Sequence, residues 1–93
     1  MGQSRRPQPV LLASKLGQIR ALLGISQEQM AEHLKHVKSS PQPGHISEFE
    51  RGKREPSLLV LVAYARLSGV SVDILVDDEL DLPGKLPLRA KRK

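Results

Sequence analysis

The chain has 93 residues, enough for one small domain, and 39% of them are apolar, enough for a compact core. It has no cysteine, which excludes disulfides, thiolate catalysis and cysteine-bound zinc. The longest apolar run, residues 58–65, is too short to span a bilayer, and the polar residues 1–9 lack a signal-peptide core. A soluble cytoplasmic protein is therefore expected, and its net charge of +5 suits a polyanionic partner.

Two helices are predicted in the first third of the chain. Residues 1–9 contain two prolines and no apolar period, which indicates a disordered basic arm. From Val10 to Gly24 the apolar residues recur at helical steps, at Leu12, Leu16, Ile19 and Leu23. Ser26 and Gln29 form a capping box that begins a second helix, whose inward side chains are Met30, Ala31 and Leu34.

A third helix follows a polar break at residues 35–41. Pro43 suits its first turn, because the missing N–H of proline costs nothing at that position. Ile46 and Phe49 then point inward at a spacing of three residues, and Gly52 ends the helix. This short segment is the second helix of a predicted helix-turn-helix.

Two more helices complete the predicted fold. The fourth opens at Pro56 or Ser57 and ends at Gly69, with the inward side chains Leu58, Leu61, Val62, Tyr64 and Ala65. The fifth is short, covers residues 72–76 and leads into an acidic exit.

The predicted fold is all-α, a compact five-helix bundle. The domain is expected to cover residues 10–81, between the arm at residues 1–9 and a flexible basic tail at residues 82–93 that is rich in Pro, Gly, Lys and Arg.

Three linked motifs carry a family resemblance. They are KLxxIRxxLGxSQExMA at residues 15–31, ISxFERGKxxPSL at residues 46–58 and GVSVD at residues 69–73. Together they resemble the Cro/cI-type (XRE-like) helix-turn-helix family, whose fold is lambda-repressor-like. The resemblance implies a sequence-specific regulator of transcription that binds double-stranded DNA as a dimer and inserts residues 43–50 into the major groove.

The resemblance also implies roles for individual residues. Gln27 matches a position that hydrogen-bonds a DNA phosphate. Arg20 and Glu50 match an ion pair that bridges the first and third helices. Further phosphate contacts are expected from the turn before the third helix and from the basic loop after it, namely Lys38, Ser40, Arg51, Lys53 and Arg54.

The segment between the first two motifs departs from the family pattern. Residues 35–45 make a longer turn than usual, and Lys35 stands where a glycine normally follows Leu34. The family's base-reading positions fall on Pro43 and Gly44, which have no hydrogen-bonding side chain. Base contacts are therefore expected from Gln42, Gly44 (by close backbone approach), His45, Ser47 and Glu48.

Catalytic and metal sites are not predicted. His33 and His36 are three residues apart, but no carboxylate is placed to complete a metal site with them. The acidic residues 73–81 lack the glycine-centred loop of a calcium site. No cofactor and no enzymatic activity are expected.

Apolar residues off the inward stripe indicate a self-association patch, formed by Leu59, Val60, Ala63, Leu67 and Ile74. Family resemblance implies a homodimer that binds two half-sites about one helical turn apart. The alternative function is a protein-interaction module, such as an antitoxin that neutralises a toxin, or a partner of polymerase, with DNA binding secondary. RNA binding is disfavoured because the chain lacks aromatic platforms that stack bases.

Overall fold

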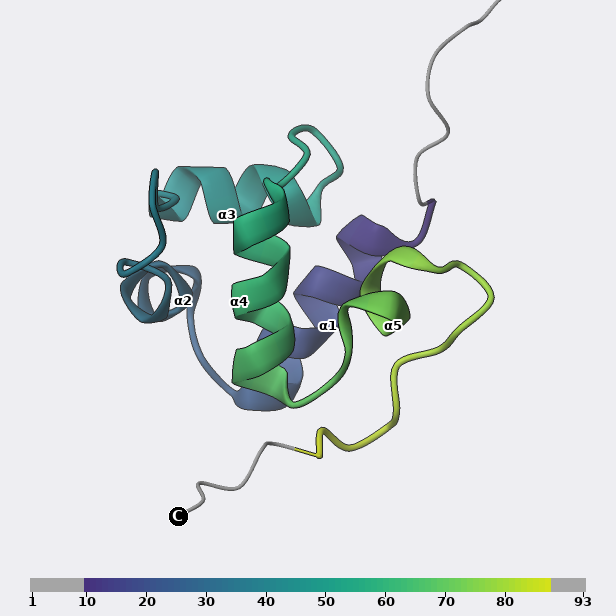
Figure 1. Ribbon diagram of the computed structural model, residues 1–93. Helices are drawn as coiled ribbons and strands as arrows, with labels where there is room; N and C mark the ends of the chain where they lie inside the picture. The colour runs from purple at the N-terminus through teal and green to yellow at the C-terminus, as the bar shows by residue number, and fades with distance from the viewer. Residues whose placement is uncertain (1–9, 88–93) are drawn as a thin grey trace, which may run out of the picture.

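The computed structural model describes residues 10–87, which contain five helices and no strand (Figure 1). The helices are α1 (Leu12–Leu23), α2 (Gln27–His33), α3 (Pro43–Glu50), α4 (Leu58–Ser68) and α5 (Val72–Val76). α3 packs against both α1 and α2, while α5 packs against α1 and α4. The all-helical bundle expected from the sequence is confirmed.

Local sequence signals set the ends of the helices. The Ser26 hydroxyl accepts a hydrogen bond from the Gln29 N–H at 3.0 Å, and Gln29 Oε1 accepts one from the Ser26 N–H at 2.8 Å. This capping box starts α2 as predicted, and Ser57 starts α4 by accepting from a backbone N–H. Gly24 and Gly69 end α1 and α4 at φ values of 73° and 84°, a conformation that favours glycine.

The core is aliphatic apart from one tyrosine and one phenylalanine. All five helices or their links supply fully buried apolar side chains, including Leu16, Ile19, Met30, Leu34, Ile46, Tyr64 and Leu75. Ser68 is buried among them and donates its hydroxyl to the carbonyl of Tyr64 at 2.8 Å. The Tyr64 hydroxyl has no hydrogen-bond partner among residues 10–87, and burial raises the pKa of this phenol.

The inward face of α4 differs from the predicted one. Leu58 is 67% exposed and Val62 is only partly buried, whereas Val60 and Ala63 are buried. Nearly every residue of α4 is apolar, so its pattern could not mark the inward face. That face follows the stripe Val60, Leu61, Tyr64, Ala65 and Ser68.

A buried lysine ties α1 to the end of α5. Lys15 is only 4% exposed, and its ammonium donates at 2.7–3.0 Å to three backbone carbonyls, those of Ile74, Asp77 and Leu80. A charged donor here satisfies carbonyls that the end of a helix leaves unpaired. Sequence reasoning missed this role, although position 15 follows Leu12 by three residues on the inward stripe of α1.

A second contact joins the acidic exit after α5 to the start of α1. The carboxylate of Asp78 accepts hydrogen bonds from the backbone N–H groups of Val10 and Leu11 at 2.8 and 3.0 Å. These bonds lower the pKa of Asp78, with the Leu11 bond the larger cause. Asp78 therefore caps the start of α1 from a distant part of the chain.

The first residues of the predicted tail are packed against the bundle. Leu86 is buried in the core and Leu82 packs against it, so the predicted boundary at residue 81 falls inside the packed part of the chain. The predicted arm at residues 1–9 and the end of the tail, residues 88–93, lie outside the described residues.

Candidate nucleic-acid interface

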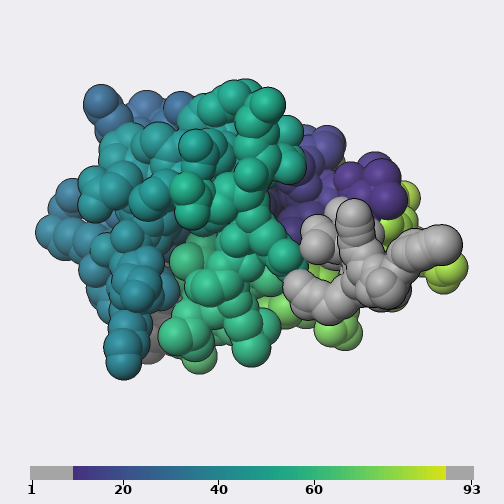
Figure 2. Space-filling model, turned by 90° about the horizontal axis from the view of Figure 1, so that it is seen from above, coloured from purple at the N-terminus to yellow at the C-terminus, as the bar shows by residue number. Residues whose placement is uncertain are grey.

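The exposed side of α3 and the loop behind it form one continuous surface. Figure 2 looks onto α3 and residues 51–57, with the α2–α3 turn at one edge and the start of α1 toward the other. Beside Gly44, near the start of α3, the space is open: a side chain there would meet nothing within 4 Å. This surface holds most of the residues that the sequence predicts to contact DNA.

A network around Glu50 fixes α3 relative to α1 and α2. Arg20 Nε donates to Glu50 Oε2 at 2.6 Å and Arg20 Nη2 to Glu50 Oε1 at 2.9 Å. Gln27 Nε2 donates to the same Oε1 at 3.2 Å, and Arg20 Nη1 donates to the carbonyl of Ile25 at 3.0 Å. The predicted Arg20–Glu50 pair is thus present, and it extends to Gln27, the first residue of α2.

The geometry of this network is that of a strong ion pair. Two parallel N–H···O bonds from one guanidinium to one carboxylate give both energy and orientation. The hydrogen bond to Glu50 raises the pKa of Arg20 above its ordinary value. The side chains of Arg20 and Glu50 are 24% and 11% exposed, so water screens the pair only in part.

Several predicted base-reading residues are engaged within α3. His45 Nδ1 accepts a hydrogen bond from the Gln42 N–H at 3.1 Å, so His45 helps to cap the start of α3. Arg51 Nε donates to the Ser47 hydroxyl at 3.2 Å, one turn back along the helix. The caps and turns of α3 therefore orient these side chains before any ligand arrives.

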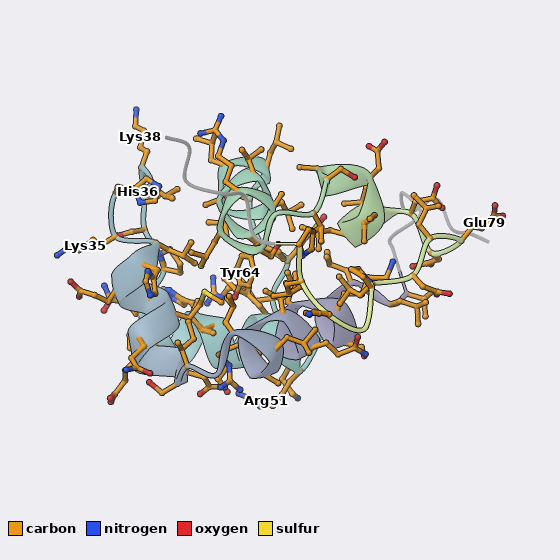
Figure 3. The ribbon with its side chains drawn as sticks, turned by 90° about the horizontal axis from the view of Figure 1, so that it is seen from below. Lys35, His36, Lys38, Arg51, Tyr64 and Glu79 are labelled. Carbon is orange, nitrogen blue, oxygen red and sulfur yellow. The ribbon has the colours of Figure 1, made fainter. Side chains whose placement is uncertain are left out.

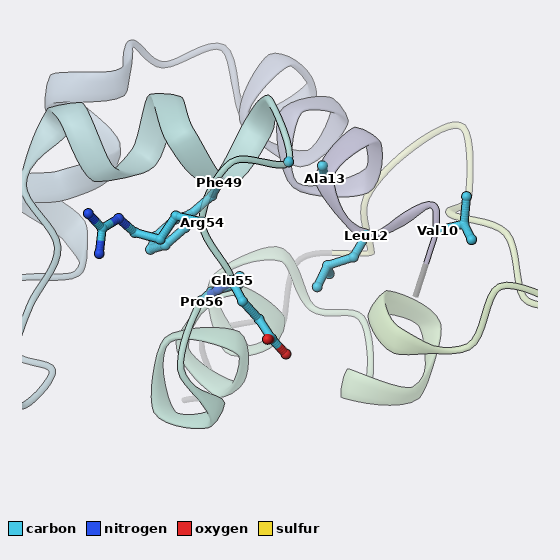
Figure 4. Close-up of a pocket in the computed structure, with 8 residues that line it drawn as sticks. Val10, Leu12, Ala13, Phe49, Arg54, Glu55 and Pro56 are labelled. Carbon is cyan, nitrogen blue, oxygen red and sulfur yellow. The ribbon is translucent and has the colours of Figure 1, made fainter. Parts of the chain in front are cut away.

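Glu48 and Arg54 form an exposed ion pair on the same surface. Arg54 Nε lies 2.6 Å from Glu48 Oε1, and this hydrogen bond lowers the pKa of Glu48. Figure 4 shows the Arg54 side chain reaching away from the neighbouring Glu55 and toward α3. Lys53, by contrast, is exposed and has no side-chain partner among the residues that the structure describes. Arg51 and Lys53 are therefore the cations of this surface that form no ion pair within residues 10–87.

The long turn between α2 and α3 does not place all of its predicted phosphate contacts beside the loop after α3. Figure 3 places Lys38 and His36 at one end of the molecule, away from Arg51. Val37 is buried and anchors the turn against the core, which directs its neighbours toward α4. Ser40 is partly buried beside the start of α3. The structure thus does not bring Lys38 together with the other predicted phosphate contacts.

Most residues of the predicted self-association patch are not exposed on the surface of the protein. Val60 and Ala63 are buried, and Leu67 and Ile74 are partly buried against the core, so only Leu59 is well exposed. The prediction that Val60 and Ala63 lie on the surface is wrong, because they belong to the inward side of α4. The exposed large apolar side chains are instead Val10, Leu11, Leu22, Leu58, Leu59, Val76 and Leu80.

An open hollow of about 200 Å³ lies between the start of α1 and the loop after α3 (Figure 4), where apolar residues such as Leu12 and Phe49 lie beside the charged residues Arg54 and Glu55. Within residues 10–87, no group of three potential metal-ligating side chains could hold an ion. Of the helices in this part of the chain, none has the length and apolar character needed to cross a membrane.

Known proteins resemble the chain in sequence and fold. A family model described as helix-turn-helix matches residues 16–75. The P22 c2 repressor, solved in complex with a synthetic operator, is similar with a TM-score of 0.62 and 22% identity, covering 72% of this chain and 94% of that one. The clp gene regulator ClgR from Corynebacterium glutamicum has a TM-score of 0.59 and 32% identity, covering 74% and 71%. No curated protein sequence matches the chain.

Proposed function

Because the chain belongs to the helix-turn-helix family, we propose that it is a regulator of transcription that binds specific double-stranded DNA sites through α3. The observation that carries this proposal is the network of Arg20, Gln27 and Glu50, which holds α2 and α3 at a fixed angle. A repressor solved with its operator and a gene regulator are among the similar structures, which supports the same class.

Phosphate contacts would come from the two ends of this surface. Gln27 uses one amide N–H on Glu50 and keeps the other for a phosphate oxygen. Arg51 Nε bonds Ser47, whereas its terminal nitrogens have no partner among residues 10–87. Lys53 supplies a third donor, and Arg54 can turn its terminal nitrogens to a phosphate while its Nε stays on Glu48.

Base contacts would come from the outer side of α3. Glu48 can accept a hydrogen bond from cytosine N4, and Gln42 can bond adenine in two places. Arg54 offsets the charge of Glu48, which lets a carboxylate approach the negatively charged duplex. Gly44 allows the backbone of α3 to come close to the DNA. A second copy of the chain would occupy an adjacent half-site.

The test is a mobility shift with DNA from upstream of the protein's own gene, measured at several salt concentrations. A regulator of this kind binds more weakly as salt rises, because phosphate contacts release counterions. Binding that is absent at low salt, or unaffected by salt, would rule out the proposal and favour a module that binds a protein partner such as a toxin.

Two substitutions separate the proposed roles. Arg51→Ala should weaken binding to all sequences and reduce its salt dependence. Glu48→Ala should change the preferred base, with discrimination lost by roughly five- to hundredfold at that position. Glu32→Ala, which removes an exposed carboxylate from α2, is the matched control and should leave the preference unchanged. Equal losses on specific and random DNA would show that Glu48 reads no base.

A further inference from the structure

A groove of about 260 Å³ lies between the α2–α3 turn and α4. Its apolar floor includes Val37, Leu59 and Val62, and its rim carries the basic side chains His36, Lys38 and Arg66. We call it the basic groove; the hollow is visible at the lower edge of Figure 2, between the turn and α4. Among residues 10–87, no carboxylate lines it. It therefore combines apolar surface with uncompensated positive charge.

The cations of the basic groove differ from the other exposed cations nearby. Lys35 bonds Glu32 at 2.6 Å, and Arg54 bonds Glu48 at the same distance. Lys38 and Arg66 make no ion pair with any residue between positions 10 and 87. An anion for these two side chains must come from outside this part of the molecule.

The acidic exit, here the last residue of α5 with the segment after it (residues 76–81), has the complementary character. Val76 and Leu80 are 37% and 39% exposed. Glu79 and Asp81 are exposed between and beside them and form no ion pair within the described range. This segment thus presents exposed apolar and acidic side chains together, as the groove presents apolar and basic ones.

The exit is also held in a fixed shape. Lys15 binds the carbonyls of Asp77 and Leu80, and Asp78 binds the start of α1. A segment that is already ordered loses little conformational entropy when it docks. Its side chains can therefore act as a preformed ligand.

The two surfaces lie at opposite ends of the molecule. Figure 3 shows His36 and Lys38 at one end and Glu79 at the other, with Arg51 on a third side. They cannot meet within one chain. We propose that copies of this protein associate head to tail, with the acidic exit of one copy seated in the basic groove of the next.

Such a contact has consequences that a symmetric dimer lacks. A heterologous interface leaves a free groove and a free exit at the ends of each assembly, so association continues beyond two copies. Because Arg51 and α3 face another direction, the contact leaves the DNA-binding surface open. If the proposed function holds, neighbouring copies would fill sites arranged as direct repeats rather than palindromes.

Charge reversal tests the contact without DNA. One variant reverses the groove (Lys38→Glu with Arg66→Glu) and another reverses the exit (Glu79→Lys with Asp81→Lys). Each variant alone juxtaposes like charges, so its self-association should weaken by roughly tenfold or more. An equimolar mixture of the two restores opposite charges at every contact. The matched control, Arg51→Glu with Lys53→Glu, makes the same charge change on the DNA-binding side.

Sedimentation equilibrium over a range of concentration and salt gives the readout, with circular dichroism as the check that each variant is folded. The wild type and the control should grow beyond dimers and should do so less at high salt. Each reversed variant should stay smaller, and the mixture should recover the wild-type mass. A closed wild-type dimer, a mixture that does not recover, or a reversed variant that associates like the wild type would overturn the proposal. A monomeric wild type would also overturn the proposal, and would favour an acidic segment of another protein as the ligand of the groove. None of these results depends on DNA binding.

Discussion

Separating Arg20 from Glu50 tests how strongly their ion pair holds α3 against α1. The perturbation is a double-mutant cycle with Arg20→Met and Glu50→Gln, which removes each charge while keeping much of the side-chain volume. Each single change leaves the other partner without its two charged hydrogen bonds at 2.6 and 2.9 Å. The double change removes both charges, so the cycle isolates their interaction.

The expected coupling follows from the burial of the pair. Breaking a fully buried ion pair costs about 3–5 kcal/mol, whereas an exposed pair contributes about 0–1 kcal/mol. The side chains of Arg20 and Glu50 are 24% and 11% exposed, between these limits but nearer the first. We therefore expect a coupling free energy of roughly 1–3 kcal/mol. A domain of this length is stable by about 5–14 kcal/mol, so a coupling of this size is a measurable fraction of its stability at 25 °C.

Urea unfolding at neutral pH, followed by circular dichroism, measures the four free energies of unfolding. The pair formed by Glu32 and Lys35 is the internal control, because its side chains are 67% and 70% exposed. The same substitutions at that pair should show no measurable coupling. If the cycle of Arg20 and Glu50 gave as little coupling as the control, the network would not be what holds α3 in place.

Three further substitutions test contacts that hold the helical bundle together. Lys15→Met should lower the free energy of unfolding by roughly 2–4 kcal/mol, because three partly buried carbonyls lose a charged donor. The exposed Lys85→Met is the control, and urea unfolding measures both. Asp78→Ala should lower the melting temperature at neutral pH. Folding lowers the pKa of Asp78, so its carboxylate stabilises the fold above the ordinary aspartate pKa, and this stabilisation is lost as the pH falls through the folded pKa. The difference in melting temperature between variant and wild type should therefore vanish in strong acid. A difference independent of pH would contradict the role of Asp78 as a cap. Tyr64→Phe removes an unpartnered hydroxyl and should leave stability unchanged or raise it by up to about 1 kcal/mol, whereas a clear loss would reveal a hidden partner.

The helices were predictable because their ends carry strong local signals. The capping box of Ser26 and Gln29 and the glycines after α1 and α4 act within a few residues, so they can be read from the chain directly. The inward face of α4 was not predictable in this way. Val60 and Leu58 are equally apolar, and only tertiary packing decides that the first is buried and the second is not.

The candidate site was likewise predictable only in part. The Arg20–Glu50 pair could be placed through the family resemblance, and the structure adds Gln27 to it. The position of Lys38 could not be placed, because the path of a long turn depends on which of its side chains is anchored in the core. The caps formed by Lys15 and Asp78 join residues 59 to 68 positions apart, and no local pattern marks such a contact.

The most direct test of the central claim begins with selection of bound sites from a random DNA pool. Binding to the selected site would then be measured against salt concentration for the wild type, Arg51→Ala, Lys53→Ala and Lys38→Ala. We predict that affinity falls steeply with salt, and that the slope drops by about one for each of the first two variants but not for Lys38→Ala. A slope that changes only with Lys38, or a pool that yields no bound site at low salt, would contradict docking through α3.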